Sequence, residues 1–314
     1  MQHDKNADRH RDSGMRYFEI EQCIGATPLV RLRSLYTGPN LVLCKLEGNN
    51  PAGSVKDRPA YWMIRNAERS GRIKPGDTLI EATSGNTGIA LAMTAAVMGY
   101  RMILVMPEHM STERRASMKA FGAELVLTSK AGSMEESIDT ARRMEREGRG
   151  VILDQFGNPD NPQAHYESTG PEIWNDTAGR VTHFVASTGT TGTLMGVSRY
   201  LKECNQDIRI VGVVPDEEGG IPGIRAWPTE YQPRVFQPER LDEQRRMSKA
   251  TAEETTRALA AREGIFAGIS SGGNVATAVE LAQELEAGGT RDAVIVTIIC
   301  DRGDRYLSTG VFPA

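Results

Sequence analysis

The fold is decided by the stretch Thr78-Leu79-Ile80-Glu81-Ala82-Thr83-Ser84-Gly85-Asn86-Thr87-Gly88. Its apolar first half predicts a buried strand, and the small-residue turn after it opens a helix that continues to about Met98. Two similar turns follow along the chain, Gly189-Thr190-Thr191-Gly192-Thr193 and Ser270-Ser271-Gly272-Gly273. Short apolar runs alternate with helical stretches throughout, which is typical of an α/β protein with a mostly parallel sheet.

Eight short apolar runs are predicted strands. They cover 41–46, 78–82, 101–106, 124–127, 151–153, 183–186, 209–214 and 293–299. The predicted helices include 55–68, 112–121, 134–147, 170–176 and 250–263. The stretch 156–165 is rich in Asn, Asp and Pro, which indicates a linker between two domains. A length of 314 residues also favours two domains.

Composition excludes several classes of protein. Apolar residues make up 39% and charged residues 25%, which excludes a disordered chain, a fibre and a coiled coil. The 37 basic and 41 acidic residues give a formal net charge of -4, so we expect no nucleic-acid partner. The 32 glycines are an excess, which indicates loops where the backbone approaches a ligand closely.

The sequence predicts neither a membrane span nor a metal site. The longest apolar run, 293–300, is far shorter than the ~20 residues that a spanning helix needs. The polar segment 1–16 has no apolar core of a secretory signal, and we expect it to be a disordered extension. The four cysteines form no CxxC pair and the five histidines no HxxH or HxxxH pair, so we expect a cytosolic protein without a metal.

The three glycine turns predict binding of an anion. The first N–H groups of a helix have no partner inside the helix, and the helix dipole puts partial positive charge there. Parallel strands place such turns together at the carboxyl edge of a sheet. The turn 189–193 lacks the GK[ST] ending of a nucleotide loop and the GxGxxG spacing of a dinucleotide site. Asp216 and Glu217 still leave a nicotinamide-binding protein open as an alternative.

Lys56 is the candidate nucleophile. It lies in Asn50-Pro51-Ala52-Gly53-Ser54-Val55-Lys56-Asp57-Arg58, directly before or within the first turn of a helix. Either Ser54 or Asp57 is predicted to cap that helix. A lysine near the positive end of a helix loses its proton more readily, which makes its amine a nucleophile for carbonyl groups. The alternative is a surface lysine paired with Asp57.

The chain resembles the fold-type-II pyridoxal-phosphate enzymes in several segments. These are the three glycine turns, the Lys56 segment and Gly25-Ala26-Thr27-Pro28-Leu29-Val30-Arg31-Leu32. The resemblance covers about 19–312, and it is greatest to the cysteine synthases, or O-acetylserine sulfhydrylases. Two segments, 45–58 and 299–309, are similar to the B-type members of that family. The resemblance implies two three-layer α/β/α domains with mostly parallel twisted sheets, as in the β chain of tryptophan synthase.

The resemblance also implies roles for the motif residues. Lys56 would hold pyridoxal phosphate as an internal aldimine, and Gly189, Thr190, Thr191, Gly192 and Thr193 would bind its phosphate. Asn86 would bond the phenolic oxygen of the cofactor ring. Ser270 would contact the pyridine nitrogen, where a hydroxyl favours β-elimination over a long-lived carbanion. Three residues would bind the carboxylate of the substrate, and these are Thr83, Ser84 and Thr87.

The reaction implied is a β-replacement through an α-aminoacrylate intermediate. O-acetyl-L-serine would lose acetate, and sulfide would add to give L-cysteine, with Lys56 as the general base. B-type members are thought to accept thiosulfate as well, through a basic stretch that follows Ile-Pro-Gly-Ile. Here that stretch reads Arg225-Ala226-Trp227, so Arg225 is retained and Ala226 replaces a second arginine.

The family resemblance further implies a homodimer and a division into two domains. Residues 47–158 would form the smaller domain with Lys56 and the carboxylate loop. Residues 17–46 with 159–314 would form the larger domain with the phosphate loop. Sister enzymes stay open as alternatives, namely O-phosphoserine sulfhydrylase, cystathionine β-synthase and serine/threonine dehydratase. A catalytically silent binding protein on the same fold is a further alternative.

Overall fold

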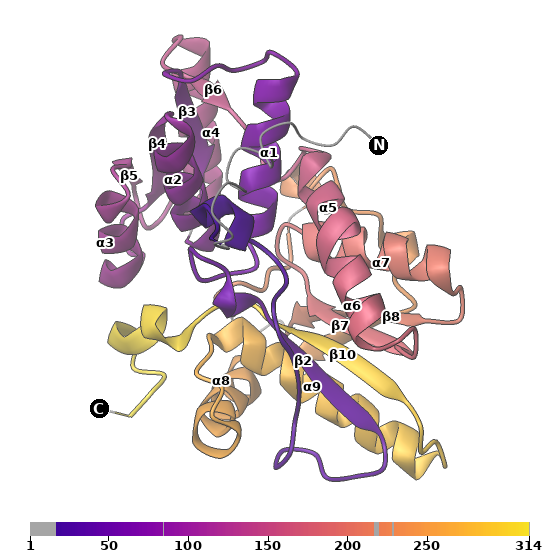
Figure 1. The fold of residues 1–314 in the computed structure, drawn as a ribbon. Helices are drawn as coiled ribbons and strands as arrows, with labels where there is room; N and C mark the ends of the chain where they lie inside the picture. Colours follow the sequence, from indigo (N-terminus) through magenta and orange to yellow (C-terminus); the bar gives the residue numbers. More distant parts are fainter. Residues whose placement is uncertain (1–16, 84, 217–219, 228, 314) are drawn as a thin grey trace.

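The computed structural model describes residues 17–83, 85–216, 220–227 and 229–313. The chain builds two sheets, each with helices on both faces, and Figure 1 shows them one above the other. The predicted extension 1–16 lies outside the described residues. Within the described part, none of the helices combines the length and the apolar character that crossing a bilayer requires.

The smaller sheet is parallel throughout and carries the stretch that decides the fold. Its strand order is β5-β4-β3-β6, and Ile80 on β3 lies opposite Ile103 on β4. The strands are β3 (Thr78–Ala82), β4 (Arg101–Pro107), β5 (Glu124–Thr128) and β6 (Val151–Ile152). The helices around them are α1 (Asp57–Arg69), α2 (Asn86–Met98), α3 (Thr112–Ala120) and α4 (Ser133–Arg146).

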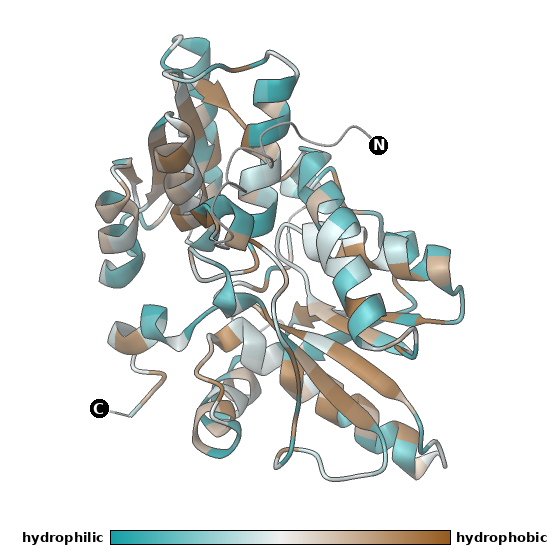
Figure 2. Ribbon diagram, viewed as in Figure 1, coloured by the Kyte–Doolittle hydropathy of each residue, from teal (hydrophilic) through white to brown (hydrophobic). Residues whose placement is uncertain are grey.

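The two faces of this sheet pack into two separate cores. Leu79 and Leu104 pack with α1 and α2, whereas Ile80 and Val105 pack with α4. This follows from the period of two along a strand. Figure 2 shows α2 as a largely apolar helix, and its residues 87–95 are all buried. The helix after the turn at 83–88 is therefore fixed in the core, which gives its N-terminus a firm position.

The larger sheet has six strands in the order β1-β2-β10-β7-β8-β9. All neighbours run parallel except β1, which is antiparallel to β2. The strands are β1 (Leu29–Arg31), β2 (Leu41–Leu46), β7 (His183–Ser187), β8 (Arg209–Pro215), β9 (Glu243–Met247) and β10 (Val294–Ile299). The predicted fold class, two three-layer α/β/α units with mostly parallel sheets, is confirmed.

Helices cover both faces of this larger sheet as well. On one face α9 (Ile269–Ala287) packs its apolar residues against Val185 and Ile295, with α8 (Lys249–Ala258) beside it. On the other face α6 (Gly170–Asp176) and α7 (Gly192–Cys204) pack against Phe184. The C-terminal 3-10 helix η7 (Gly303–Thr309) then crosses to α3, and Figure 1 shows it in yellow below that helix.

One prediction of local structure is wrong, and an edge strand was missed. The predicted linker 156–165 contains helix α5 (Asp160–Ala164), which continues through the π-helical turn η3 (His165–Thr169) into α6. The side chain of Asn158 accepts a hydrogen bond from the N–H of Asp160 at 2.9 Å, and Pro162 lies in the first turn, where a helix tolerates proline. The strand β9 was not predicted, because its sequence Glu-Gln-Arg-Arg-Met has no apolar run.

Candidate active site

A cavity of about 760 Å³ lies where the carboxyl ends of strands from both sheets meet. Residues that directly follow β3, β4, β7 and β8 line it, as expected for a ligand site in an open α/β sheet. Its lining includes seven of the predicted site residues, Lys56, Thr83, Asn86, Thr87, Gly189, Thr190 and Arg225. Sequence segments more than a hundred residues apart therefore meet in one cavity.

Lys56 is the residue directly before α1. The carboxylate of Asp57 accepts hydrogen bonds from the backbone N–H of Ala52 at 2.5 Å and of Ser54 at 3.3 Å, which fixes the turn before the lysine. Burial lowers the pKa of the Lys56 amine, and the nearby Cys300 and Asp301 oppose that shift only in part. The amine is thereby prepared to lose a proton and act as a nucleophile or base.

The turn after β3 is folded around the side chain of Thr83. Its Oγ1 accepts hydrogen bonds from the N–H of Gly85 at 3.3 Å and of Gly88 at 3.2 Å. Thr87 is buried in the first turn of α2 and lines the cavity. The predicted carboxylate-binding residue Ser84 lies outside the described residues. The start of α2 thus offers N–H groups and hydroxyls at the edge of the cavity.

The side chain amide of Asn86 is held at both ends. Its Nδ2 donates to Asp301 at 2.6 Å, and its Oδ1 accepts from Arg305 at 2.5 Å. Asp301 also accepts from the hydroxyl of Tyr306 at 2.7 Å. Sequence reasoning missed these three partners, which lie directly after β10. The segment 299–309 was noted only as part of a family motif.

The turn 189–193 forms a cradle behind the cavity. Thr191 has a φ of 66°, a conformation that costs energy for a residue with a branched Cβ. Its Oγ1 is buried and has no hydrogen-bond partner in the described part of the chain. A Cβ at Gly192 would lie 1.9 Å from Asn161 Oδ1, so a larger residue there would displace the Asn161 side chain that bonds to Thr190. A partnerless hydroxyl and a close-packed glycine indicate a site built for a ligand.

Neighbouring side chains hold this turn in place. Asn161 on α5 donates to Thr190 Oγ1 at 3.2 Å, and the ring Nε2 of His165 lies 3.3 Å from Thr193 Oγ1. The carbonyl of Gly189 accepts a hydrogen bond from the indole of Trp227 at 2.7 Å. Gly192 and Thr193 do not line the main cavity, and Thr191 lines a neighbouring one of about 590 Å³.

Ser270 lies in the first turn of α9 and is buried. It does not line the main cavity, but Gly223, which does, packs directly over it, because a Cβ there would come within 3.0 Å of Ser270 Oγ. Burial raises the pKa of the neighbouring Cys300 thiol to about 11, so the thiol stays protonated near neutral pH. The thiol therefore behaves as a small apolar group at the end of β10.

The cavity favours anions. Its described lining carries the basic side chains of Lys56, His109, Arg114 and Arg225 and only one acidic side chain, that of Asp216. Arg225 stacks on Trp227 with its guanidinium 5.0 Å from the ring centroid, and Arg114 stacks on Tyr306 at 4.8 Å. Sequence reasoning missed Arg114, because a lone arginine on an amphipathic helix carries no signal of its own.

The half-buried Lys56 amine and the turn 189–193, with its partnerless hydroxyl, fit a cofactor that has both an aldehyde and a phosphate. Fold and site together define an enzyme of the pyridoxal-phosphate class. The family described as "Pyridoxal-phosphate dependent enzyme" matches residues 20–301, and the chain belongs to this family. The predicted cofactor, pyridoxal phosphate, is thereby confirmed.

Individual relatives narrow this class to cysteine synthases. The chain is 60% identical to cysteine synthase B of Pseudomonas aeruginosa over 95% of this chain and 98% of that protein. It is also 60% identical to cysteine synthase B of Escherichia coli over 93% and 95% of the two chains. The predicted resemblance to B-type cysteine synthases is confirmed.

Solved structures agree with this assignment of the fold. An O-ureido-L-serine synthase superposes with a TM-score of 0.89 at 39% identity and covers 95% of this chain and 96% of its own. Cysteine synthase from Entamoeba histolytica has a TM-score of 0.87 at 39% identity, over 96% and 92% of the two chains. The fold is therefore shared along nearly its whole length with enzymes of this group.

Proposed function

We propose that the chain is a cysteine synthase that makes L-cysteine from O-acetyl-L-serine and sulfide by β-replacement. The observation that carries the proposal is the half-buried Lys56 amine, with its lowered pKa, in a cavity lined by both the turn 83–88 and the start of the turn 189–193. The 60% identity to cysteine synthase B over nearly the whole chain supports the same reaction.

The cofactor would be held at several points. Lys56 would bind it covalently, and the N–H groups and hydroxyls of 189–193 would bind its phosphate. Asn86 and Ser270 would contact its ring. When bound, pyridoxal phosphate withdraws electrons from the α-carbon of an amino-acid substrate and makes the α-proton acidic. A hydroxyl at Ser270 rather than a carboxylate keeps this withdrawal moderate, which favours elimination.

The chain's own residues would orient the substrate and move its proton. Thr83, Ser84, Thr87 and the N–H groups at the start of α2 would bind the substrate carboxylate. This contact turns the α C–H bond toward Lys56 Nζ, and the amine, whose pKa burial lowers, takes the proton. The same amine then returns a proton to the product.

The sulfur donor follows from the charge of the cavity. Sulfide is a small anion that the basic lining attracts. Arg225 is the residue that would bind the second charged end of thiosulfate, while Ala226 provides no charge beside it. We therefore propose sulfide as the preferred donor and thiosulfate as a weaker one. Steady-state rates with both donors decide between them.

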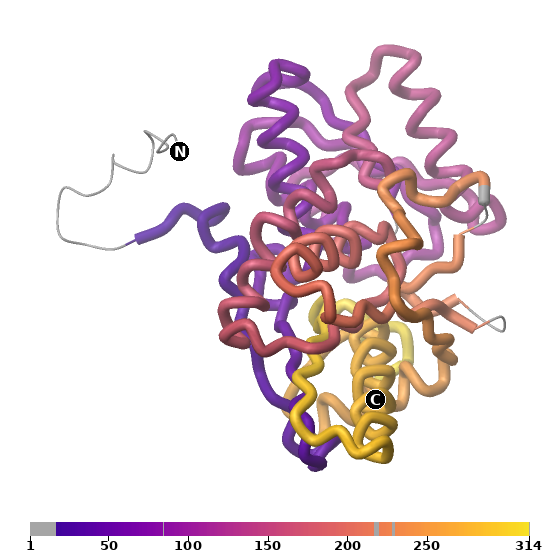
Figure 3. Tube along the Cα trace, turned by 90° about the vertical axis from the view of Figure 1, so that its right-hand side faces the viewer, coloured from indigo at the N-terminus to yellow at the C-terminus, as the bar shows by residue number. Residues whose placement is uncertain are grey.

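Assembly, domain boundaries and location stay predictions. Tyr17, Phe18 and Ile20 place apolar surface on the N-terminal segment, which Figure 3 shows at the side of the molecule. We propose that a second copy of the chain covers this segment, and sedimentation analysis would give the mass of a dimer. The division into 47–158 and the remainder, and the cytosolic location, rest on the sequence.

Borohydride reduction tests the proposed function directly. We expect reduction of the yellow protein, followed by digestion and mass spectrometry, to find the cofactor on the peptide that contains Lys56. Lys56→Ala should lose both this adduct and the synthesis of cysteine from O-acetylserine. Lys249→Ala serves as the control, because that side chain is exposed and pairs with Glu253 on α8. An adduct on another peptide, or cysteine synthesis without Lys56, would overturn the proposal.

The alternatives give different results in the same assays. A colourless protein that binds NADH would be a nicotinamide-binding protein. A yellow protein that does not turn over O-acetylserine would be a sister enzyme or a silent binding protein. Rates with O-phosphoserine, homocysteine and serine then identify the sister activity.

A further inference from the structure

One continuous helical segment connects the phosphate cradle to the helix that follows Lys56. It consists of α5, the π-helical turn η3 and α6, from Asp160 to Asp176. At its beginning, Asn161 and His165 contact Thr190 and Thr193 of the cradle. Near its end, Glu172 contacts Arg58 in the first turn of α1. A π-helical turn is rare in proteins and often marks a functional site.

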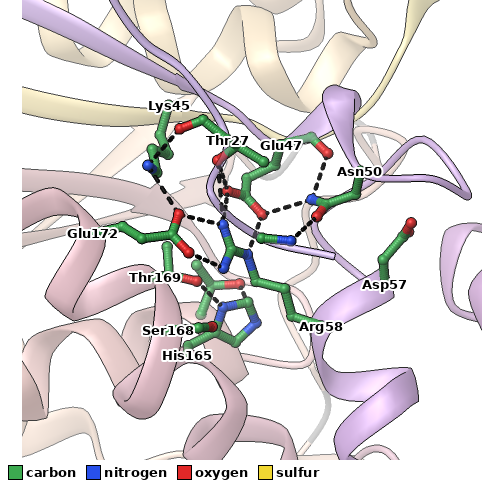
Figure 4. A network of polar contacts seen from close by, with 12 residues as sticks. Thr27, Lys45, Glu47, Asn50, Asp57, Arg58, His165, Ser168, Thr169 and Glu172 are labelled. Carbon is green, nitrogen blue, oxygen red and sulfur yellow. Dashed lines mark hydrogen bonds and ion pairs between the residues drawn. The ribbon is translucent and has the colours of Figure 1, made fainter. Parts of the chain in front are cut away.

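Arg58 is the centre of the polar network in Figure 4. Its guanidinium donates to Glu172 through NH1 at 2.7 Å and NH2 at 2.8 Å, as a bidentate pair. It also donates to Glu47 through Nε at 2.7 Å and NH2 at 2.8 Å. Such forked pairs fix a geometry as well as an energy, because both planes must align. The first turn of α1 is thereby fixed to α6.

The N-terminal motif 25–32 closes over this pair. Gly25 and Ala26 have φ values of 94° and 47°, and the N–H of Ala26 donates to Glu172 at 3.0 Å. A Cβ at Gly25 would lie 3.0 Å from Arg58 NH1 and 3.1 Å from Glu172 Oε1. The motif is thus shaped to cover the ion pair, a role that the proposed function does not give it.

The network is buried and balanced in charge. The side chains of Arg58 and Glu47 are 1% and 0% exposed, and that of Glu172 is 21% exposed. Lys45, also buried, adds a second positive charge at 3.0 Å from Glu172. Burial opposes ionisation of Glu172, but the hydrogen bond and charge of Arg58 prevail and lower its pKa to about 2. Removal of Arg58 would leave the buried carboxylate of Glu47 without its counterion.

We propose that Arg58 and Glu172 are a positioning pair that fixes the separation between Lys56 and the cradle 189–193. A cofactor held covalently at one end and by its phosphate at the other requires these two points at a set distance. Lys56 lies two residues before Arg58, and Glu172 belongs to the same helical segment as the residues that hold the cradle. The inference rests on the proposed function, because it assumes these two attachment points.

Three variants of the full-length holoenzyme test the pair. Glu172→Gln removes the charge and keeps the size, and Arg58→Lys keeps the charge and removes the fork. Asp176→Asn is the matched control. Asp176 lies on the same helix as Glu172, and it pairs with Lys45 at 2.9 Å rather than with Arg58. The readouts are loss of pyridoxal phosphate on serial dilution, followed by visible absorbance, and unfolding by urea at saturating cofactor. Values of kcat and KM for O-acetylserine are measured alongside.

We expect Glu172→Gln to weaken cofactor binding about tenfold and to lower kcat, with KM within about twofold of the parent. Arg58→Lys should weaken cofactor binding and lower kcat to a smaller extent. If Glu172→Gln does not fold, Arg58→Lys alone tests the proposal. Asp176→Asn should match the parent protein. Unchanged cofactor affinity in both pair variants, or an equal loss in the control, would mean a purely structural ion pair and overturn the proposal.

The proposed function can fail separately. If Lys56→Ala leaves the visible absorbance and the reduced adduct unchanged, the attachment point is wrong, whatever the pair variants do. If Lys56→Ala loses both and the pair variants still bind the cofactor like the parent protein, the positioning proposal alone is wrong.

Discussion

Asp301 Oδ2 accepts a hydrogen bond from Asn86 Nδ2 at 2.6 Å and thereby joins the end of β10 to the first residue of α2. β10 belongs to the larger sheet, whereas α2 follows β3 of the smaller one. The other carboxylate oxygen of Asp301 is buried and has no partner in the described part of the chain. This carboxylate therefore does not serve the fold alone, and it sets the direction in which the Asn86 amide points.

Asp301→Asn tests this control of Asn86. An amide at 301 can donate as well as accept, so the Asn86 side chain loses its fixed orientation. We expect kcat to fall about tenfold, with a cost in unfolding free energy of about 1–3 kcal/mol. The visible absorbance of the bound cofactor should shift, because its ring loses a defined partner. Asp304→Asn, on the exposed side of the same segment, should leave kcat, the unfolding free energy and the visible absorbance unchanged.

Thr191 combines a strained backbone with a partnerless hydroxyl, and substitution separates the two. Thr191→Gly removes the cost of a φ of 66° and should raise the unfolding free energy by about 1 kcal/mol. The same change removes the hydroxyl and should weaken binding of pyridoxal phosphate. Thr191→Ser restores the hydroxyl and should restore most of the affinity. Equal cofactor affinity in the glycine variant would show that the hydroxyl has no ligand role.

Much of this site could be predicted from local sequence. The turns at 83–88 and 189–193 were recognisable because the strand-turn-helix pattern and the residue types are local. Lys56 became a candidate through the family motif, because its turn alone left a surface lysine paired with Asp57 as the alternative. The fold class followed from the alternation of apolar runs and helices. These features depend on neighbours along the chain, which a sequence displays directly.

The parts that were missed depend on distant contacts. Arg114 and Asp301 acquire their roles only when α3 and the end of β10 meet at the cavity. Helix α5 was assigned to a linker because its Asn, Asp and Pro residues are typical of loops, although they also suit a helix start. Strand β9 forms at a sheet edge through pairing with β8, which overrides its charged sequence.

Glu81 predicts a pH dependence of stability. Burial raises the pKa of this carboxyl to about 8, although the N–H groups of Gln155 and Asp154 bond to it. Between its ordinary value of 4.5 and about 8, the native state keeps a proton that the unfolded chain has lost. The free energy of unfolding should therefore fall as pH rises through this window, on the order of 3 kcal/mol from this group.

Glu81→Gln removes this contribution, because the amide does not titrate. Urea unfolding at about pH 5 and about pH 8 should give a smaller difference for the variant than for the parent protein. Asp57, whose pKa burial raises to about 7, contributes in the same direction in both proteins and cancels in the comparison. Identical pH dependence in the two proteins would show that Glu81 is ionised in the native state.

The C-terminal segment contacts the smaller sheet's helix α3 through Glu113 and Ser308. The carboxylate of Glu113 accepts from the Ser308 N–H at 2.9 Å and from its hydroxyl at 2.7 Å. These bonds lower the pKa of Glu113, so the contact persists at neutral pH. Ser308 is exposed and Glu113 is only half-buried, which means that the contact adds little to global stability. Its effect should instead be on how firmly Tyr306 and Thr309 line the cavity.

Glu113→Ala should therefore change substrate binding more than folding. We expect KM for O-acetylserine to rise about threefold to tenfold, while the unfolding free energy changes by no more than about 0.5 kcal/mol. Asp139→Ala is a matched control, since it removes an exposed acid that pairs with Arg142 on α4, away from the C-terminal segment. An unchanged KM in Glu113→Ala would show that the segment lines the cavity without this contact. A large loss of stability would show that the contact belongs to the folding core rather than to the site.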